Sequence, residues 1–450
     1  MTAPMKKELL LSSCEEAIDL AKKLGADEAE VFASSTVERN VGIEKNDLHQ
    51  SSQVSETTWG IRVVKGGAVG FCTSNQPSSL KKAVSEAVGL ASIAPPDVHN
   101  GIAQPMGDIP SIVAVDEDLI NYGIDELTAM AMRLLSGACR LDGRLTIDRG
   151  GVGINHQTTA VASSTGTRCS YESAAGNGFL FGMCVDGDEV GSFSYDGDTV
   201  RSAADLENAL NVSFDRFVKK CAGAMGATSG ESFNGPVVLP PETVSEFLMG
   251  DLIAMMGADA VRTGKSPLGE KLGEVIASTS LSIFEEGLGL KGFPICPFDR
   301  EGMLRKRTPL IENGVLSNLL FNSYESRAVN GALSSNATGG ASSLPSVGAS
   351  AISVATGSDQ YKNMVNMEQG IIVTRFSSSS NPLTGDFSGV VKGGFLVKNG
   401  ERRPIEETTI AGNLYECLRS ISAISDTALL MNGTVSMPAI KIDGLSVTAG

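Results

Sequence analysis

The sequence predicts an α+β fold, in which two helix–strands–helix units precede an antiparallel-sheet domain that contains one central helix. The chain has 51 glycines but a single tryptophan, a ratio typical of sheet-rich structure with many tight turns. In the N-terminal half, segments with apolar residues three and four positions apart flank runs of strand-forming residues. In the C-terminal half, Asn313-Gly314 and Asn399-Gly400 each interrupt apolar runs, which predicts hairpins with type I′ turns. At 450 residues, the chain is long enough for two or three domains.

The first predicted unit spans residues 1–115. It opens with a helix near Lys6 to Leu24 that Gly25 closes as a C-cap. Strands follow, and a second helix runs from Ser79 to Ser92, before a proline-rich linker. The predicted strands are Ala29–Ser34, Val37–Lys45, Leu48–Ser55 and Thr57–Thr73, with Gly66-Gly67 turning the last pair.

The second predicted unit, residues 116–229, repeats this order. A helix from Ile124 to Cys139 and a helix from Ala203 to Met225 enclose strands between Leu145 and Tyr195. The same order in both units suggests a pseudo-repeat of pattern, without sequence identity. Turns are predicted at Asp142-Gly143, Asp186-Gly187 and Asp196-Gly197.

The third predicted domain, residues 230–450, is organised around the stretch from Val237 to Leu268. Pro240 and Pro241 suit the first turn of a helix, and apolar residues then recur at helical spacing, which predicts a helix to about Val261. This helix contains no histidine, and its only acids are Glu246, Asp251 and Asp259. Further on, Ser334–Ser346 and Ser377–Gly389 are rich in polar and small residues and are predicted to be long loops, either functional or simply solvated.

The composition excludes several classes of protein. A net charge of −16 argues against a nucleic-acid groove, which needs clustered Lys and Arg. The sequence has no run of 18 apolar residues and no signal-peptide core near Met1, so we expect a cytoplasmic protein without a membrane segment. The eight cysteines are scattered without a C-x-x-C pair and are expected to be reduced and buried.

Three segments of the C-terminal half resemble the TldD/TldE family, also called PmbA or modulator of DNA gyrase. They are RTPLIENGVLSNLLFNSYESR (Arg307–Arg327), TTIAGNLYECL (Thr408–Leu418) and PAIKIDGLSV (Pro438–Val447). Catalytic TldD-type members of that family carry His-Glu-x-x-x-His on the central helix and a further cysteine ligand near the C-terminus. With Gly264-Lys265-Ser266 as the anchor, those motif positions fall on Met249, Gly250 and Ala254, and the C-terminal cysteine is missing.

The resemblance therefore implies a TldE/PmbA-like chain without catalytic, cofactor-binding or metal-binding residues of its own. Such a chain would form a heterodimer with a TldD-like catalytic subunit that holds zinc and cleaves peptides or unfolded segments, and it would be inactive alone. The segment Thr384-Gly385-Asp386 also resembles a family segment; it is a turn, and a candidate lining of the peptide-bearing cleft. The alternative is a self-associating peptide-binding module, a homodimer with no proteolytic role.

Other motifs do not carry chemistry. Gly264-Lys265-Ser266 lacks the earlier glycine of a P-loop, and Gly287-x-Gly289-x-x-Gly292 is followed by a proline-containing segment where the dinucleotide fingerprint needs a helix. The three histidines, His49, His99 and His156, lie far apart in sequence and near no catalytic set. Glu246, Asp251 and Asp259 do not share one helical face, so we expect exposed or salt-bridged carboxylates in place of a metal site.

Overall fold

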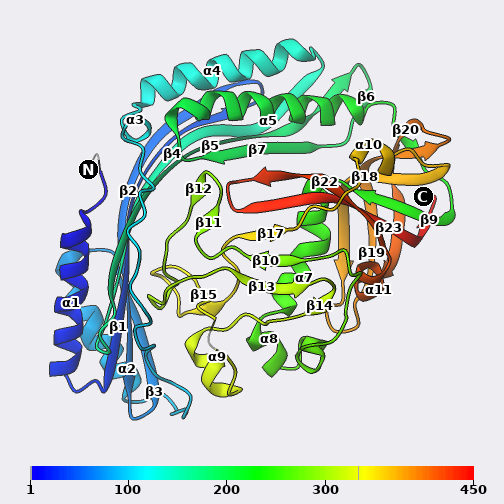
Figure 1. Ribbon diagram of the computed structural model, residues 1–450. Helices are drawn as coiled ribbons and strands as arrows, with labels where there is room; N and C mark the ends of the chain where they lie inside the picture. Colours follow the sequence, from blue (N-terminus) through cyan, green and yellow to red (C-terminus); the bar gives the residue numbers. More distant parts are fainter. Residues whose placement is uncertain (1–2, 333) are drawn as a thin grey trace.

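The structure is a computed structural model that describes residues 3–332 and 334–450. The N-terminal half forms a long, seven-stranded sheet with strand order β3-β2-β1-β4-β5-β6, and β7 pairs with β5. Figure 1 shows this sheet arching over the C-terminal half, with its helices on the outer face. The strands are β1 (Glu28–Glu44), β2 (Asp47–Lys65), β3 (Ala68–Ser74), β4 (Leu145–Ser163), β5 (Arg168–Asp186), β6 (Glu189–Val190) and β7 (Ser194–Val200).

The buried residues of β1 show that all the large helices pack on one face of this sheet. Ala29, Val31 and Ala33 pack in a core with α1 and α2, whereas Val41 and Ile43 pack in a second core with α4 and α5. Because side chains alternate along a strand, these odd-numbered residues all point to the same side. The helices are α1 (Lys7–Lys23), α2 (Leu80–Ala91), α4 (Ile124–Leu141) and α5 (Ala203–Gly223), with the short η1 (Pro77–Ser79) and α3 (Glu117–Ile120).

The helix–strands–helix order of both predicted units is present, but their strands do not form separate sheets. Strand β1 of the first unit pairs antiparallel with β4 of the second along its length, from Glu30↔Ser163 to Glu44↔Arg149. The predicted repeat is therefore merged into one sheet, on which the two helix pairs cover two separate cores. The domain boundaries at residues 115 and 229 stay predictions.

Three details of the N-terminal prediction are wrong. The predicted breaks near Ser35 and Glu56 do not exist, because β1 and β2 pair without interruption across both positions. Asp196-Gly197 is not a turn but the middle of β7, paired with Phe179 and Leu180 of β5. The Asp-Gly pair was misleading because the turn preference of these residues is weaker than the tertiary pairing that holds this strand.

The C-terminal half forms a twelve-stranded sheet with order β14-β13-β10-β17-β23-β9-β18-β19-β20-β8, to which β21 and β22 add by pairing with β23. Three of its pairings are parallel, β9–β18, β17–β23 and β8–β20, so the predicted antiparallel sheet is in fact mixed. The strands are β8 (Thr228–Ser229), β9 (Phe233–Leu239), β10 (Ile283–Glu285), β13 (Thr308–Glu312), β14 (Val315–Leu316), β17 (Ile352–Val354), β18 (Gln369–Ser380), β19 (Asp386–Lys398), β20 (Glu401–Glu406), β21 (Thr408–Asn413), β22 (Ile421–Met431) and β23 (Val435–Thr448).

Both predicted Asn-Gly hairpins are confirmed. Asn313 and Gly314 have φ of 49° and 81° between β13 and β14, and Asn399 and Gly400 have the same values between β19 and β20. Positive φ at both central residues is what a type I′ turn requires. Small hairpins and helices complete this half: β11 (Gly289–Leu290), β12 (Phe293–Pro294), β15 (Ala337–Thr338), β16 (Ser346–Val347), η3 (Pro267–Lys271), α9 (Ser323–Ala328), α10 (Tyr361–Met364) and α11 (Leu414–Arg419).

The predicted loop Ser377–Gly389 is wrong in extent. Its serines pair with the start of β19, so that β18 runs to Ser380 and the connection is short. Composition alone misleads here, because a polar strand needs only a paired backbone. The segment Ser334–Ser346 is irregular except where Ala337 and Thr338 pair with β16.

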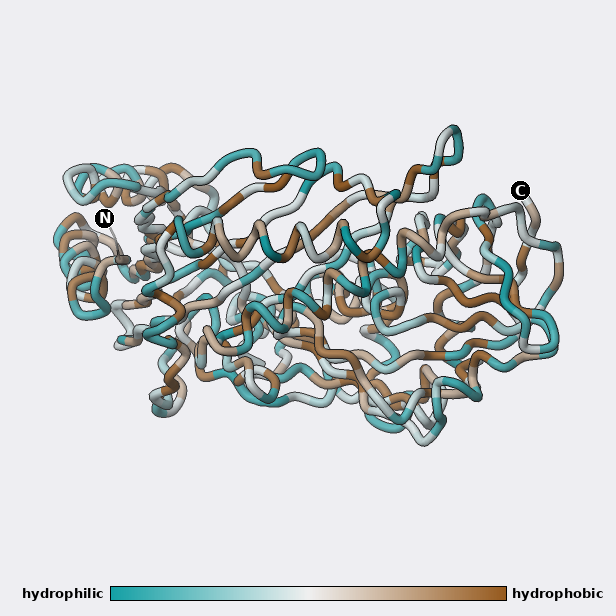
Figure 2. Tube along the Cα trace, turned by 90° about the horizontal axis from the view of Figure 1, so that it is seen from above, coloured by the Kyte–Doolittle hydropathy of each residue, from teal (hydrophilic) through white to brown (hydrophobic). Residues whose placement is uncertain are grey.

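No helix among residues 3–332 and 334–450 has the length and apolar character needed to cross a membrane. Figure 2 shows polar and apolar residues interspersed along the elements, and both views place the two termini at opposite ends of the molecule.

Candidate functional site: the central helix and the cleft beside it

The central helix is not a single α-helix. It consists of α6 (Pro241–Thr243), the π-helix η2 (Val244–Met249), α7 (Gly250–Met255) and, after a break, α8 (Ala258–Arg262). The break replaces the predicted continuous helix to Val261, because Met256 and Ala258 exchange backbone hydrogen bonds with Leu320. Short π-helical segments inside helices occur frequently at functional sites.

One side of this helical segment is anchored in the core of the C-terminal half. The ring of Phe247 packs edge-on against Phe376 and Phe387, at centroid distances of 5.0 and 4.7 Å. Val244, Leu248 and Leu252 are fully buried in the same core. The opposite side is exposed at Glu246, Gly250 and Ala254, residues four positions apart that form an open stripe.

A cleft of about 510 Å³ lies beside the N-terminal end of this helix, between the two halves of the molecule. One wall is the edge strand β7 with Phe179 of β5, and the other is the helix with Thr374 and Arg375 of β18. The helix α5 contributes Arg216 and Lys220. Pockets that form between structural units and combine apolar walls with a few charged groups are typical binding sites.

An ion-pair network of four residues from both halves lines one part of the cleft. Asp196 of β7 accepts hydrogen bonds from Arg216 and Lys220, both at 2.8 Å. Lys220 also forms an ion pair with Glu242 at 2.9 Å. Burial opposes ionisation of Glu242, but the Lys220 ammonium outweighs it and holds the pKa of Glu242 below its ordinary value. These charges satisfy one another.

Two further carboxylates line the cleft without an ion pair within 4.0 Å. Glu246 accepts a hydrogen bond from the Tyr195 hydroxyl, and Asp198 accepts one from the backbone N–H of Thr199 at 2.8 Å. Partial desolvation beside the cleft walls raises the pKa of both carboxyls, although Arg375 opposes the shift at Glu246, and the Thr199 N–H and then Arg216 oppose it at Asp198. Perturbed carboxylates in a cleft mark a candidate functional site.

Of the predicted loop residues, Thr384 and Gly385 lie in the turn between β18 and β19, and Asp386 is the first residue of β19. Asn413 binds this turn, because its Nδ2 donates to Thr384 O at 2.8 Å and to Asp386 Oδ1 at 2.9 Å. The Asn413 hydrogen bond also lowers the pKa of Asp386. Next to the turn, the Ser380 hydroxyl donates to Asp251 of α7, so the turn lies close to the central helix. Whether it contacts peptide stays a prediction.

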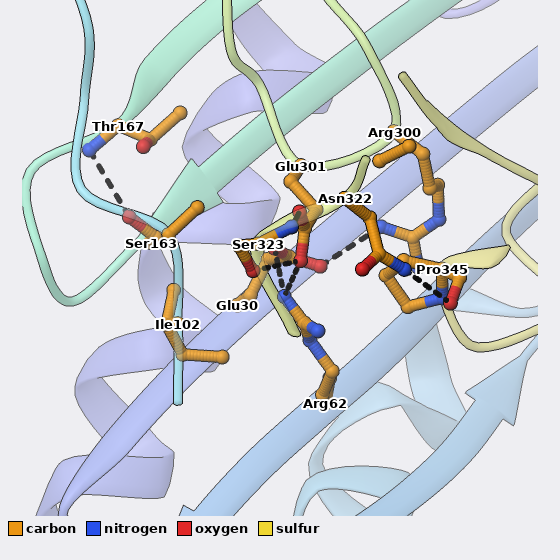
Figure 3. Close-up of polar contacts among 12 residues, drawn as sticks. Glu30, Arg62, Ile102, Ser163, Thr167, Arg300, Glu301, Asn322, Ser323 and Pro345 are labelled. Carbon is orange, nitrogen blue, oxygen red and sulfur yellow. Dashed lines mark hydrogen bonds and ion pairs between the residues drawn. The ribbon is translucent and has the colours of Figure 1, made fainter. Parts of the chain in front are cut away.

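A buried charge cluster holds the two halves together (Figure 3). Glu30 and Arg62 face each other across β1 and β2, with 2.7 Å between Arg62 Nη2 and Glu30 Oε2. From the C-terminal half, Glu301 binds Arg62 at 3.0 Å and Arg300 binds Glu30 at 2.8 Å. Ser323 secures Glu301 through its backbone N–H at 2.8 Å and its hydroxyl at 2.6 Å.

The two arginines of this cluster have different environments. Burial opposes the charged form of Arg62, but Glu30 and Glu301 together outweigh it and raise the pKa of Arg62. Arg300 has only Glu30 as a direct carboxylate partner, so burial lowers the pKa of Arg300. Arg300 also stacks on Phe32, with its guanidinium 4.3 Å from the ring centroid. The cluster therefore fixes the C-terminal half against β1 and β2.

Comparison with known proteins gives two family matches along the chain. Residues 232–449 match the PmbA/TldA metallopeptidase C-terminal domain, and residues 29–91 match PmbA/TldA metallopeptidase domain 1. Together these matches span more than half of the chain. The chain belongs to the PmbA/TldD family.

Relatives in this family extend the similarity to nearly the whole chain. The metalloprotease PmbA of Escherichia coli O157:H7 is 28% identical over 96% of this chain and 96% of its own length. A metalloprotease PmbA homolog from Haemophilus influenzae is 25% identical over 95% of this chain and 94% of its own length. The crystal structure of TldE from Thermococcus kodakarensis shares the fold, with a TM-score of 0.88, 22% identity, and coverage of 97% of this chain and 100% of that chain.

The PmbA/TldD family models are named for metallopeptidases, and a metallopeptidase holds its zinc with side-chain donor atoms. Met249 is buried in the core with 2% exposure, and Gly250 and Ala254 offer no donor atom. Zinc takes imidazole, thiolate or carboxylate ligands, so these three side chains do not fit it. Among residues 3–332 and 334–450, no three His, Cys, Asp or Glu side chains are grouped to hold a metal ion.

The other candidates from the sequence are far apart. His156 Nε2 forms a hydrogen bond with Glu172 Oε1 at 2.9 Å. The ring of His99 packs edge-on against Tyr324, and His49 is exposed near Glu44. All eight cysteines are unpaired; five of them are buried as expected, whereas the expectation of burial is wrong for Cys72, Cys139 and Cys296, which are partly exposed. Glu246 and Asp251 make separate contacts, with Tyr195 and Ser380. Asp259 is exposed.

Sequence reasoning missed the sheet wall of the cleft. Tyr195 is the last residue of the predicted strands and Asp196-Gly197 is a predicted turn, whereas Tyr195, Asp196 and Asp198 all belong to β7 and all line the cleft. The signal available in the sequence was that Tyr195 and the acids after it continue the strand pattern. The turn preference of Asp196-Gly197 pointed the prediction to a turn instead.

Proposed function

We propose that this chain is a TldE/PmbA-like, non-catalytic subunit of a TldD/TldE-type zinc metallopeptidase that processes peptides and unfolded segments. The supporting observation is the chemistry of the central helix. Its open stripe presents Gly250 and Ala254, and Met249 points into the core. A metallopeptidase needs donors that hold the metal and a general base beside it, and the three matched positions provide neither.

In this role, a TldD-like partner contributes the metal site and its general base, and this chain contributes a wall of the shared chamber. We expect that chamber to include the cleft beside the helix and the turn at Thr384, Gly385 and Asp386, whose neighbour Ser380 contacts Asp251 of α7. Association with the partner also stabilises both chains, because a partner that binds only the folded state shifts the folding equilibrium.

The test is to purify the full chain alone, the TldD-like neighbour alone, and both after co-expression. Each sample is assayed for zinc content and for cleavage of a reduced, unfolded protein. The proposal predicts that the two chains co-elute, that zinc is found only in samples that contain the partner, and that only the complex cleaves the unfolded protein. Stoichiometric zinc and cleavage by this chain alone would contradict it.

A matched pair of variants sharpens the test. Replacing a motif histidine of the partner by alanine is expected to abolish cleavage. Gly250→Ala in this chain is expected to leave cleavage unchanged, because the nearest atom to the added methyl group is 4.0 Å away and the position is exposed. Loss of cleavage only with Gly250→Ala would place the chemistry on this helix and overturn the proposal.

A further inference from the structure

The middle of β2 is an open edge of the N-terminal sheet. Strand β1 pairs with β2 along nearly its whole length, whereas β3 pairs only with Trp59–Lys65. Within residues 3–332 and 334–450, no strand pairs with the other side of β2 between Gln50 and Glu56. Every second residue of such an edge points its backbone N–H and C=O groups away from the sheet. These groups can bind another extended strand.

The segment Gln50–Glu56 lacks the features that usually protect an edge. All seven of its residues are exposed, so the chain covers neither face of the strand there. Gln50–Ser55 contains no charged residue and no proline, although charged residues make up 20% of the sequence. The segment itself pairs regularly with β1, because the register shift at Gly42/Ile43 lies before it. Natural proteins protect open edges with charges, prolines or bulges, so we expect a partner to cover this one.

A second copy of this chain fits the open edge. The chain carries a net charge of −16, so most of its surface repels another copy. The segment Gln50–Ser55 carries none of that charge, and its serine and glutamine side chains can both donate and accept hydrogen bonds. Two copies of one edge can also pair antiparallel about a twofold axis, which closes the assembly as a dimer.

A twofold axis restricts how the two edges can align. Residues that oppose each other in an antiparallel pair lie on the same face of the sheet, and side chains alternate between faces along a strand. An axis at Gln53, the centre of the open segment, meets this condition. It places Gln50 opposite Glu56 of the other copy and Ser52 opposite Val54 of the other copy. No carboxylate then opposes another, and the exposed Val54 gains cover.

We propose that two copies of this chain pair antiparallel through the segment Gln50–Glu56 of β2, with the twofold axis at Gln53, and thereby join their N-terminal sheets into one. The contact lies away from the cleft, because β2 and β7 lie at opposite edges of this part of the sheet. It goes beyond the proposed function, since it needs no TldD-like subunit.

The test measures the mass of the full chain, purified alone, by sedimentation equilibrium at low salt over a range of concentrations. The chain has a mass of 46.8 kDa, and the proposal predicts a reversible, concentration-dependent species of twice that mass. The variant Ser52→Lys places like charges at diagonal positions on one face, where they repel. It is expected to weaken the dimer about fivefold, and Ser52→Glu is expected to do the same.

A mixture of the Ser52→Lys and Ser52→Glu chains makes the test specific for a second copy. Opposite charges then lie close together, so the mixed dimer is expected to regain the affinity of the unchanged chain. The matched control is Ser388→Lys, at an exposed serine of β19 whose strand is paired on both sides, with Ser379 and Ala411. This variant is expected to leave the dimer unchanged, and circular dichroism checks that every variant is folded.

Three results would overturn the proposal. The first is a chain that remains monomeric over the whole concentration range. The second is a dimer that the Ser52 variants do not weaken, or that they weaken without recovery on mixing. The third is a TldD-like subunit that binds this edge in place of the second copy. None of these results bears on the absence of zinc and cleavage in the lone chain, which the assays of the proposed function test separately.

Discussion

At the scale of single residues, burial decides how each charge behaves. Glu30 and Arg300 have 0% and 2% exposure, yet each is matched by an opposite charge across the boundary between the two halves. Glu285, also buried, accepts from the backbone N–H of Ser350 at 3.0 Å and has Arg305 only at 3.9 Å. Burial, partly offset by these contacts, raises the pKa of Glu285 to about 7. Paired and poorly paired buried acids should therefore respond differently to substitution and to pH.

The variant Glu30→Gln is expected to lower the free energy of unfolding by about 3 kcal/mol, because removing one partner of a buried ion pair leaves the other charge uncompensated. Arg300 would lose its direct carboxylate, whereas Arg62 would keep Glu301. Urea unfolding followed by circular dichroism measures the loss. The control Glu16→Gln, at an exposed helical site, should change stability by less than about 0.5 kcal/mol. Equal stability of the two variants would show that the cluster is not a structural bond between the halves.

The variant Glu285→Gln tests the pH dependence. The folded protein keeps a proton on Glu285 up to about pH 7, whereas the unfolded chain releases it near its ordinary pKa. The contribution of this residue to stability is therefore fully present below the ordinary pKa and is lost as pH rises through the folded value. As the pH rises from about 5 to about 8, the free energy of unfolding of the variant should increase by about 2 kcal/mol relative to that of the unchanged protein. Denaturant unfolding at both pH values measures this difference, and a difference that does not vary with pH would contradict the shifted pKa.

At the scale of elements, the sequence predicted the helix ends and hairpin turns that depend on neighbouring residues alone. Gly25 ends α1 with φ of 88°, and the Asn-Gly pairs form the predicted hairpins. These features depend on residues that few other conformations favour. The length of β1 and β2, the π-helix η2 and the break at Gly257 depend instead on partners far away in sequence, such as Leu320. No local pattern could reveal them.

The candidate site divides in the same way. That Met249, Gly250 and Ala254 cannot bind a metal follows from the residue types alone, and their match to the motif positions is a prediction from the family resemblance. The cleft could not be derived, because its walls come from β5, β7, α5 and β18 as well as the helix. Only the folded chain brings Tyr195 to Glu246.

A pair of glycine substitutions tests how strongly turns fix the elements. Gly314 has φ of 81°, and a methyl group there would lie 2.5 Å from the carbonyl oxygen of Ala277. Gly66 has φ of 58°, with nothing within 4 Å of an added methyl group. Gly314→Ala should therefore lower the free energy of unfolding by about 3 kcal/mol, and Gly66→Ala should lower it by only about 1 kcal/mol. Thermal or denaturant unfolding measures both, and equal costs would mean that the close backbone approach at Gly314 does not constrain the hairpin.

At the scale of the whole molecule, one sheet and one buried charge cluster position the two halves, and the cleft lies between them. The arching N-terminal sheet carries its helices outward and presents its other face to the C-terminal half (Figure 1). Because buried ion pairs join the halves, the cleft between them is formed by the folded chain itself, as binding sites usually are. The chemistry of the central helix, which presents no metal ligand at Met249, Gly250 or Ala254, agrees with the proposed role of a non-catalytic subunit.

The most direct test of this account is the metal content of the purified full chain after dialysis, measured together with its ability to cleave an unfolded protein. The account predicts zinc far below one ion per chain and no cleavage without a TldD-like partner. Stoichiometric zinc that survives dialysis, together with cleavage by the lone chain, would contradict it.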